Sequence, residues 1–397
     1  MKIKHFLFSI IFALLFKLSG TAQTWVQVPS GVSTQLNSIF LQSPNTIYTA
    51  GNLGVGLKTI DGGNSWNQMN VGVANHNAVR FINPNTGFIA GANLGILKTT
   101  DGGSTWAYIS GGSPALYDLF FTDSVSGWAV GAPEMGFGTL FTPTLMTFIQ
   151  INAIAGKNLN GIWFTNSMNG WVVGYLGTII RTVNGGTTWL PQTSNTTESL
   201  SKIMFIDATT GITVGFNGTI MKTTDGGSNW NQLTSGTMQN LHAVYYADIN
   251  NVWACGDSGI ILHSSDAGQN WNVENSGTGV SLRSIHGIGT SDVYACGLGG
   301  VIIRRTNLST IQETTLHNNF SIYPCPASQY ATIEFENLKS EIYSLSLYNC
   351  RAQLVRKVND ISSNNIQIER GALENGLYLF RINDNEQTVC SGKLQFE

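Results

Sequence analysis

The stretch Thr59-Ile-Asp-Gly-Gly-Asn-Ser-Trp66 decides the fold, because it recurs along the chain. The copies are Thr99-Thr-Asp-Gly-Gly-Ser-Thr-Trp106, Thr182-Val-Asn-Gly-Gly-Thr-Thr-Trp189, Thr223-Thr-Asp-Gly-Gly-Ser-Asn-Trp230 and Ser264-Ser-Asp-Ala-Gly-Gln-Asn-Trp271. Their tryptophans lie 40 or 41 residues apart, or 83 apart across one degenerate unit. A fixed period of this length is typical of a toroid or solenoid built from similar units.

The same spacing gives the number of units. Phe148 takes the aromatic position of the degenerate unit, and Trp25 stands one period before Trp66. The last unit stops near Arg305 without a fourth strand, so we expect the strand around Trp25 to complete it and close the ring. The sequence therefore predicts an all-β fold: a seven-bladed β-propeller over residues 23–305, closed by its N-terminal strand, followed by a small β-sandwich.

We interpret the repeated turn, an Asp-box or BNR repeat, as structural. Its Asp carboxylate can accept bonds from backbone N–H groups of its own turn, and its glycines tolerate positive φ. The following Trp is then placed to pack at the base of the hairpin. A structural role, not catalysis or metal binding, is assigned to the box residues Asp61, Trp66, Asp101, Trp106, Asn184, Trp189, Asp225, Trp230, Asp266 and Trp271.

Composition and charge narrow the class of partner. The 397 residues include 45 glycines and only 11% charged residues, which fits a turn-rich β protein with a sizeable core. A net charge of −3 without a basic block argues against nucleic acid as the partner. The histidines lack metal-ligand spacing, and neither a calcium loop nor a nucleotide-binding glycine motif is present. We expect no metal and no cofactor.

Residues 1–22 are predicted to be a signal peptide. Lys2 and Lys4 precede an apolar run from Phe6 to Phe16, and small residues end the segment at Ala22. The run is too short to span a bilayer, and no later segment has eighteen consecutive apolar residues. We therefore expect a monomer that is exported, secreted or held on the outer cell surface, and not integral to a membrane.

Cys255 and Cys296 occupy the same position in adjacent units, where other units carry Ala or Val. Two interpretations stay open. The pair could form a disulfide between blades in an oxidising compartment, which requires Cα atoms within about 7 Å. Alternatively, both are small core residues. The total of five cysteines leaves at least one unpaired within a single chain.

A different pattern begins after the repeat ends at residue 305. Residues 306–318 are polar and are interpreted as a linker. Seven short alternating segments then follow between Phe320 and Leu394, and they predict a small β-sandwich over residues 319–397.

This last region resembles the type A C-terminal sorting domain of the type IX secretion system of Bacteroidota. The resemblance is carried by Phe320-Ser-Ile-Tyr-Pro-Cys-Pro-Ala, Leu347-Tyr-Asn-Cys-Arg-Ala-Gln-Leu-Val, Gly376-Leu-Tyr-Leu and Gly392-Lys-Leu, with Tyr323, Pro324, Pro326, Gly376, Tyr378 and Lys393 as motif positions. Cys325 and Ala352 stand where the family usually has Asn and Gly. The resemblance implies export across the outer membrane, the secretion machinery as a partner, removal of the domain, and release or attachment at the cell surface.

The propeller units resemble the family of photosystem II assembly factors. The stretch Gly215-Phe-Asn-Gly-Thr-Ile-Met-Lys-Thr-Thr-Asp-Gly-Gly-Ser-Asn-Trp230 carries this resemblance best. It implies non-catalytic binding of a partner, but the sorting domain points to a non-photosynthetic lineage. From this family we therefore carry over to the present chain only the expectation that it binds a partner, and not the identity of the partner. We expect an extracellular protein or glycan as the ligand.

Asp-boxes also occur in sialidases, so a sialidase-like glycoside hydrolase acting on extracellular glycans is the alternative function. That chemistry needs a carboxylate pair, or a tyrosine activated by a glutamate, and an arginine cluster that holds an anionic sugar. The propeller has few arginines. The carboxylates expected at the mouth opposite the boxes are Asp118, Glu134, Glu198 and Asp257.

Register points to a set of candidate binding residues. Counting 14 residues back from the repeat glycine of each unit reaches the start of the inner strand, where every residue is polar or amphipathic. The set is Asn37, Asn77, Tyr117, Asn160, Ser201, His242 and Arg283. A polar rim above an apolar wall is typical of a concave site. A strand entry is also polar where it simply meets solvent, and both interpretations stay open.

Two irregular positions add candidates. Arg80 is the single cation in a slot that otherwise holds Phe40, Phe120, Trp163, Met204, Tyr245 and His286. It must be paired, stacked or near water, either as a ligand contact or as a satisfied core arginine. The degenerate third unit has lost its box and has a longer second turn, 132–138, with Glu134. This turn is either a recognition loop or a product of drift.

Overall fold

The computed structural model describes residues 25–92, 95–109, 115–124, 126–134, 137–142, 147–151, 157–305, 320–324, 326–335, 342–349, 353–383 and 388–397. For residues 133–151 and 388–391 it describes the backbone only. The predicted signal peptide and the predicted linker lie outside these residues. The chain divides into two units, Met1–Asn307 and Leu308–Glu397, and this boundary falls within the predicted linker.

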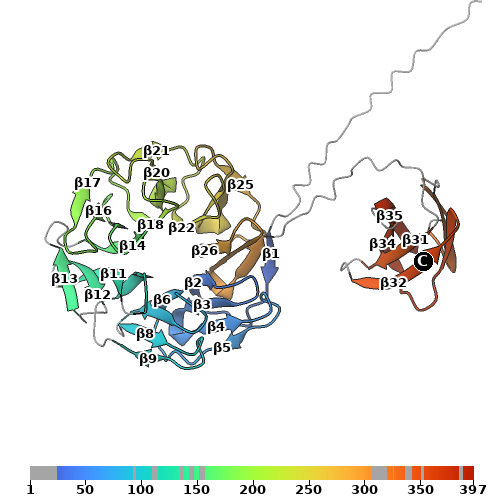
Figure 1. The fold of residues 1–397 in the computed structure, drawn as a ribbon, viewed down its shortest axis with the longest axis horizontal. Coiled ribbons are helices and arrows are strands. Elements are labelled where there is room, and N and C mark those ends of the chain that lie inside the picture. The colour runs from blue at the N-terminus through green and yellow to red at the C-terminus, as the bar shows by residue number, and fades with distance from the viewer. Residues whose placement is uncertain are drawn as a thin grey trace, which may run out of the picture. The chain divides into compact units, whose positions relative to one another are not determined.

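Within its described residues, the first unit contains seven four-stranded antiparallel sheets arranged around an axis (Figure 1). The strands nearest the axis are β2 (Leu36–Leu41), β6 (His76–Phe81), β10 (Leu116–Phe121), β14 (Leu159–Phe164), β18 (Leu200–Phe205), β22 (Leu241–Tyr246) and β26 (Leu282–Ile288). The second strands are β3 (Ile47–Gly51), β7 (Gly87–Gly91), β11 (Gly127–Glu134), β15 (Gly170–Gly174), β19 (Gly211–Gly215), β23 (Val252–Gly256) and β27 (Asp292–Gly297).

The third strands lie farther from the axis. They are β4 (Gly56–Thr59), β8 (Ile96–Thr99), β12 (Phe137–Thr142), β16 (Ile179–Thr182), β20 (Ile220–Thr223), β24 (Ile261–Ser264) and β28 (Ile302–Arg305). The fourth strands form the outer edge of the ring of sheets in Figure 1. They are β5 (Asn67–Gln68), β9 (Ala107–Tyr108), β13 (Thr147–Ile151), β17 (Leu190–Gln192), β21 (Asn231–Leu233), β25 (Asn272–Glu274) and, for the last sheet, β1 (Trp25–Val28).

Strand β1 pairs antiparallel with β28, with Trp25 opposite Arg305 and Val28 opposite Ile302. Strand β2 contacts both β6 and β26, so the first and last sheets are neighbours. The hydroxyl of Tyr294 in the last sheet also donates to the carbonyl oxygen of Gly62 in the first box, at 3.0 Å. The predicted all-β architecture with propeller-like blades is confirmed.

The core of this unit lies between neighbouring sheets. Except in the third sheet, where part of the second strand is described by its backbone only, Ile47–Gly51 and its equivalents are buried along nearly their whole length. Their aromatic side chains stack on the ring that ends the next inner strand, as Tyr48 does on Phe81 with ring centroids 3.8 Å apart. The pairs Phe88–Phe121, Trp128–Phe164 and Trp171–Phe205 repeat this contact at 3.5 to 3.8 Å. Aromatic stacking and burial therefore hold each sheet to the next.

The Asp-box closes on itself through side-chain hydrogen bonds. In the first box, Asp61 accepts from the backbone N–H of Ser65 at 2.9 Å and from the Ser65 hydroxyl at 2.6 Å. The hydroxyl of Thr59 donates to Asp61 and accepts from the Gly63 N–H. Asp101 accepts from the N–H and hydroxyl of Thr105 in the same way. Asp225 and Asp266 accept from the N–H and the side-chain amide of an asparagine instead.

The box tryptophans pack at the base of the hairpin. Trp106, Trp189 and Trp230 each lie edge-on to the phenylalanine that ends the inner strand of their own sheet, with ring centroids 5.9 to 6.0 Å apart. Trp66 and Trp271 are partly buried against neighbouring core clusters. The repeated motif therefore takes part in packing and turn formation.

Cys255 and Cys296 are both free thiols, so the disulfide that the sequence left open is not formed. Each is fully buried in a different apolar cluster, beside Ile261 and Leu36 respectively. Burial raises the pKa of both thiols. The interpretation as small core residues fits this environment.

The third sheet is complete despite its degenerate sequence. Strand β12 pairs with β13, and Phe141 lies opposite Phe148. Strand β11 extends to Glu134, beyond the ends of its counterparts, which matches the longer second turn in the sequence. The side chains of Glu134 and Phe148 and the lost box at 143–144 lie outside the described residues.

The second unit contains two antiparallel sheets. One has the order β29 (Phe320–Tyr323), β30 (Tyr330–Phe335), β33 (Asn365–Glu369), and the other β32 (Leu354–Ile361), β31 (Tyr343–Tyr348), β34 (Gly376–Asn383), β35 (Thr388–Phe396). Residues of both sheets, among them Ile333 and Phe380, form one buried cluster. Of the motif side chains, Tyr378 is buried, whereas Tyr323, Pro324, Pro326 and Lys393 are exposed, as is Gly376.

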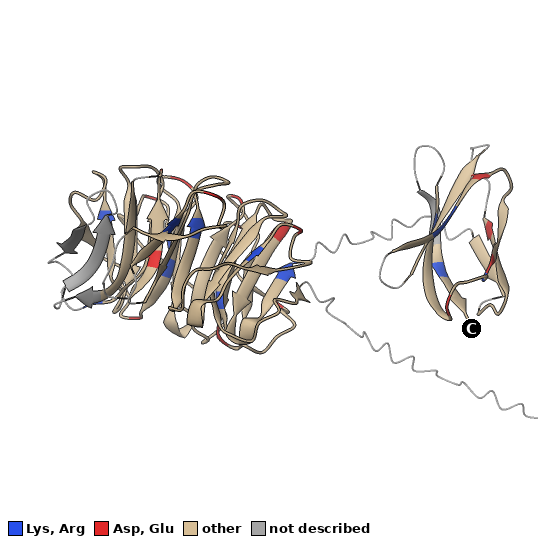
Figure 2. Ribbon diagram, turned by 90° about the horizontal axis from the view of Figure 1, so that it is seen from below, with Lys and Arg blue, Asp and Glu red and all other residues tan. Residues whose placement is uncertain are grey.

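Charged residues are sparse on the ribbon (Figure 2), in line with their 11% share of the sequence. Within the described residues, no helix reaches the length and apolarity needed to cross a bilayer.

Candidate functional site

The seven rim candidates occupy one equivalent position, at which the pairing of each inner strand shifts register. Leu36 pairs with Gly51 and Ser38 with Ala50, so that Asn37 is skipped. The same shift skips Asn77, Tyr117, Asn160, Ser201, His242 and Arg283. A bulge re-aims the extra side chain and disrupts the ladder locally. Each of the seven residues is half-buried at the same end of its sheet.

The three asparagines among the seven link neighbouring sheets through the same hydrogen bond. The amide of Asn37 donates to the carbonyl oxygen of His76 at 2.9 Å. Asn77 donates to Leu116, and Asn160 donates to Leu200, both at 2.8 Å. In each case the acceptor is the first residue of the next inner strand. These asparagines therefore fasten one sheet to the next, a role that the sequence did not reveal.

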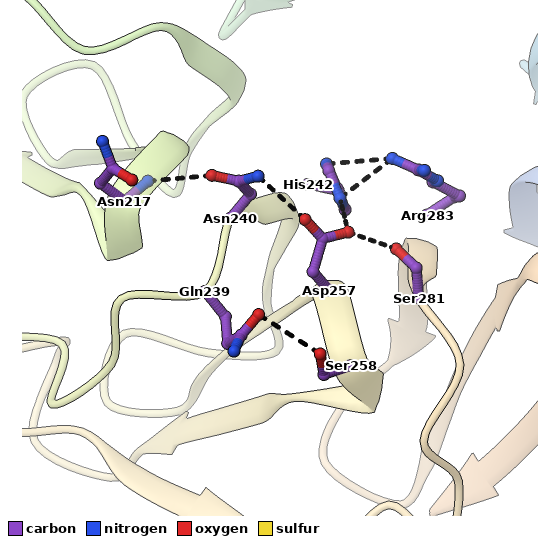
Figure 3. Close-up of polar contacts among 8 residues, drawn as sticks. All are labelled: Asn217, Gln239, Asn240, His242, Asp257, Ser258, Ser281 and Arg283. Atoms are coloured by element: carbon purple, nitrogen blue, oxygen red, sulfur yellow. Dashed lines mark hydrogen bonds and ion pairs between the residues drawn. The ribbon is translucent and has the colours of Figure 1, made fainter.

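A polar cluster forms where His242 and Arg283 meet, at the sixth and seventh sheets (Figure 3). Its centre is Asp257, which begins the short 3-10 turn η4 (Asp257–Gly259). Asp257 Oδ1 lies 2.7 Å from His242 Nε2 and 2.5 Å from Ser281 Oγ, and its Oδ2 accepts from Asn240 Nδ2 at 2.9 Å. The Arg283 Nη1 lies 3.0 Å from His242 Nε2. We name these five residues the mouth cluster.

The charges in the mouth cluster are set by this geometry. Burial acts to raise the pKa of Asp257, but hydrogen bonds from Ser281, His242 and Asn240 outweigh it and hold the pKa at about 2. Burial lowers the pKa of His242, and the nearby Arg283 lowers it further, against the opposite effect of Asp257. At neutral pH the cluster thus holds a carboxylate, a neutral imidazole that donates from Nε2, and a guanidinium.

Arg283 retains hydrogen-bonding capacity. Among the described residues, its buried Nε has no hydrogen-bond partner. A guanidinium presents its donors in a planar fork that matches a carboxylate. Because Nε is buried, an approaching group could reach this half-buried guanidinium only through its Nη atoms.

Exposed apolar side chains lie at the same end of the neighbouring sheets. Leu200 at the start of β18 pairs with Gly215 at the end of β19, so the turn η3 (Phe216–Gly218) lies beside Ser201. Phe216 is 41% exposed, and Met238, in the loop before β22, is 78% exposed. The turn after β15 exposes Tyr175 and Leu176 in the same way. Asn217 joins this area to the mouth cluster, because its N–H donates to Asn240 Oδ1 at 3.0 Å.

Below the rim, the inner strands line a channel whose polar groups are mostly paired. Asp118 is buried and accepts from Lys202 Nζ at 2.7 Å and from the Ile162 N–H at 3.0 Å. It therefore lies inside the channel and not at the mouth, where the sequence placed it. Ser38 and Ser284 occupy the equivalent slot and likewise accept from an N–H of the neighbouring strand. Arg80 is stacked, with its guanidinium carbon 3.9 Å from the Phe120 ring centroid.

The sequence found part of this site. It singled out His242, Arg283 and Asp257 separately, but it did not bring them together, and it missed Asn240 and Ser281. Both of these lie two residues before a rim position, and the carbonyl oxygen of this slot accepts from the residue after the repeat glycine, as from Asp257 and Leu298. The repeat could have revealed this slot. Tyr117 and Ser201 join no such cluster, and Ser201 Oγ is buried without a partner among the described residues.

Within the described part of the chain, no group of His, Cys, Asp or Glu side chains is arranged to hold a metal ion.

Comparisons with known proteins found a matching family for each unit. The sequence matches the family described as photosynthesis system II assembly factor YCF48 over residues 18–112, 145–235 and 192–275. Residues 321–395 match the secretion system C-terminal sorting domain. No curated protein matches the sequence.

Solved structures with similar folds include YCF48 from Cyanidioschyzon merolae, with 20% identity over 71% of this chain and 98% of that chain and a TM-score of 0.59. A structure of YCF48 bound to D1 peptide has 19% identity over 72% of this chain and 97% of that chain, with a TM-score of 0.59. The WD40 propeller domain of Doa1 has 10% identity over 72% of this chain and 98% of that chain, with a TM-score of 0.58. At these identities the likeness shows the fold alone.

Proposed function

Since the chain belongs to the photosynthesis system II assembly factor YCF48 family, we propose that it is an exported, non-catalytic propeller that binds a segment of an extracellular protein at its rim. The family match covers more than half of the chain, and one similar structure is YCF48 bound to D1 peptide. The observation that carries the proposal is the mouth cluster, in which a guanidinium, a neutral imidazole and a fully hydrogen-bonded carboxylate stand beside exposed apolar side chains.

The ring is proposed to be closed, with seven blades. The pairing of β1 with β28 and the contact of β2 with β26 support this. Closure leaves no free sheet edge in the ring and gives one rigid rim on which the rim residues converge. A rigid scaffold suits recognition, because little conformational freedom is lost when a partner binds.

The C-terminal unit matches a sorting domain, which implies export to the cell surface or beyond. We propose that the type IX machinery recognises residues 319–397 and that the propeller then acts outside the cell. The exposed motif side chains Tyr323 and Lys393 support recognition by a protein partner.

A ligand with both acidic and apolar groups fits this surface best. The half-buried guanidinium of Arg283 offers its Nη donors to a carboxylate, whereas Phe216 and Met238 offer apolar contact area. Protein segments commonly combine these groups. A glycan is the alternative ligand, since an aromatic side chain such as Phe216 can also cover the apolar face of a sugar.

The hydrolase alternative receives little support from the carboxylates. A glycosidase acid requires a raised pKa, but the pKa of Asp257 is held at about 2. Asp118 is engaged by Lys202 and a backbone N–H. Glu198 Oε2 accepts from the Asn217 amide at 3.0 Å.

Site-directed photo-crosslinking on the cell surface tests the proposal. A photoreactive residue at Phe216, at the rim, is compared with one at Ile249, which is similarly exposed but lies in the turn between β22 and β23 at the opposite end of the sheet. We expect a protein adduct from position 216 that is lost when Arg283→Met is added. The charge-matched variant Arg181→Met, on the third strand β16, should retain it.

Three results would overturn the proposal. A protein adduct from position 249 alone would place binding at the other face. Adducts at position 216 that persist in Arg283→Met would remove the mouth cluster from recognition. Binding of a glycan without any protein adduct would favour the alternative ligand, and turnover of that glycan would favour the hydrolase.

A further inference from the structure

The channel contains a small cavity that all seven inner strands line. Its volume is about 60 Å³, and the lining includes Arg80, Asp118, Lys202 and His286. This is space for a few water molecules and far less than the roughly 300–1,000 Å³ of a typical ligand pocket. The cavity is too small for a sugar ring or a peptide, so it is distinct from the proposed binding surface at the rim.

Arg80 brings a cation into this cavity without a protein counterion of its own. Its guanidinium carbon lies 3.9 Å from the centroid of Phe120 and 5.0 Å from that of Trp163, and no described residue forms a hydrogen bond or an ion pair with it. Burial lowers the pKa of Arg80 to about 10, against the effect of Asp118, so the group is still charged at neutral pH. The aromatic rings stack on the face of the guanidinium and stabilise its charge. Its N–H donors point outward in the plane of the group, so stacking does not provide them with acceptors.

Asp118 interacts with Arg80 through its charge, but no hydrogen bond joins the two among the described residues, and its oxygens accept from other donors. Oδ1 accepts from Lys202 Nζ at 2.7 Å, and Oδ2 accepts from the Ile162 N–H at 3.0 Å. The cavity lining therefore carries two cations, Arg80 and Lys202, and one carboxylate. The result is one excess positive charge in a narrow channel, where an uncompensated charge is costly.

His286 supplies a second donor in the same cavity. Its Nδ1 accepts from the Leu41 N–H at 3.1 Å, so the neutral ring carries its proton on Nε2. Burial, reinforced by Arg80 and Lys202, lowers the pKa of His286 to about 3, so the ring is neutral at physiological pH. Its position is fixed by packing against Phe40 and Tyr245, with centroids 4.8 and 5.6 Å away.

We propose that the channel binds one small monovalent anion, a halide or a carboxylate group, on the guanidinium of Arg80, with the Nε2–H of His286 as a second donor. The anion balances the excess charge of the lining, and the cavity size restricts the site to an ion of few atoms. Such an ion ties together side chains from β6 and β26, which belong to different sheets. It therefore stabilises the ring, independently of any ligand at the rim.

Thermal unfolding of the full chain tests this site. Bromide is titrated at constant ionic strength against gluconate, which is too large for the cavity. Because an ion that binds only the folded state raises its stability, we expect a saturable rise in the melting temperature of the wild type. The rise should vanish in Arg80→Met and weaken in Arg80→Lys. It should persist in Arg181→Met, which removes an equal charge that lies near Trp171 outside the channel.

Crystals of the wild type grown in bromide provide a second readout that needs no variant. We expect an anomalous peak in the channel within hydrogen-bond distance of Arg80. The absence of that peak, or an equal bromide response in wild type and Arg80→Met, would overturn the proposal. A formate titration distinguishes the two ligand forms: an equal rise indicates a site that accepts a carboxylate, and a rise with bromide alone indicates a halide site.

Discussion

Single side chains in the boxes show how one repeated position takes two chemical forms. Asp101 accepts the Thr105 N–H at 2.9 Å and the Thr105 hydroxyl at 2.6 Å. Asn184 occupies the same position, accepts the Thr188 N–H at 2.9 Å, and donates to the Thr188 hydroxyl at 2.9 Å. Because a hydroxyl both donates and accepts, each turn is satisfied. Only the aspartate form can be titrated.

The stability of a box should therefore depend on acid pH only where the box carries an aspartate. Hydrogen bonds from the Thr105 hydroxyl, the Thr105 N–H and Thr99 lower the pKa of Asp101 from 3.8 to about 2. A folded-state pKa below the unfolded value gives stability that is complete above pH 4 and is lost as the pH falls towards 2. Asp101→Asn should flatten this acid limb, and Asn184→Asp should steepen it. Urea unfolding between pH 2 and 6 measures both.

The two box variants act as controls for each other. At pH 7 both should unfold close to the wild-type midpoint, since the same turn accommodates either side chain. Equal pH dependence in the wild type and both variants would show that the box hydrogen bonds are not formed in solution.

Sequence reasoning at this scale succeeded where the chemistry is local. The Asp-box bonds lie within four or five residues, so the turn motif alone predicts them. The link from Asn37 to His76 and the meeting of His242 with Arg283 join different sheets, and only the folded ring brings those atoms together.

In each pair of inner and second strands, the bulge and the repeat glycine occur together. The repeat glycine of each second strand pairs with the residue just before the bulge, and a side chain there would collide with backbone. A methyl group on Gly215 would overlap the carbonyl oxygen of Ser199, two residues before Ser201. The rim position and the repeat glycine therefore depend on each other, which explains why a constant count of residues joins them in the sequence.

Substituting this glycine should lower the free energy of unfolding. Because the overlap is with backbone, Gly215→Ala should destabilise the propeller by about 1–3 kcal/mol, the usual range for overpacking. Gly279→Ala is the control, since a methyl group there meets nothing within 4 Å and its φ is not positive. It should change the free energy of unfolding by less than about 0.5 kcal/mol. Equal unfolding midpoints for the two variants would contradict the close approach at Gly215.

The repeat pattern in the sequence predicted the strands and their order, but it did not predict the bulge. The sequence marks an inner strand by its apolar alternation, but the skipped residue is the second of the strand, so only one residue precedes the change of phase. The register shift at Asn37 is visible only in the pairing of Leu36 with Gly51. For the same reason the position of Asp118 inside the channel could not be inferred, since its depth depends on the bulge one residue earlier.

For the whole propeller, the arrangement rests on the strand that comes first in the sequence. Trp25 is fully buried in the last two sheets, and its indole N–H donates to Glu274 Oε2 at 2.8 Å. Trp253 donates to the same oxygen at 3.3 Å, and Arg305 Nε lies 3.7 Å from Glu274 Oε1. One carboxylate on β25 thus holds both strands of the junction, β1 and β28.

The spacing of aromatic residues predicted that Trp25 belongs to the last sheet, because a fixed period carries information across the whole repeat. It did not predict the contact with Glu274, which lies 249 residues away in the sequence. The signal peptide and the removal of the sorting domain stay predictions, since they concern processing.

The closed ring is the central claim, because the rim, the channel and the proposed anion site all depend on it. The most direct test is a disulfide between positions 26 and 304, since Val26 and Arg304 are direct partners across β1 and β28. In the variant Val26→Cys/Arg304→Cys, mild oxidation followed by peptide mapping should find an intramolecular 26–304 linkage in nearly all folded monomers. If the 26–304 linkage is found only between two chains, or not at all, the ring is not closed by β1.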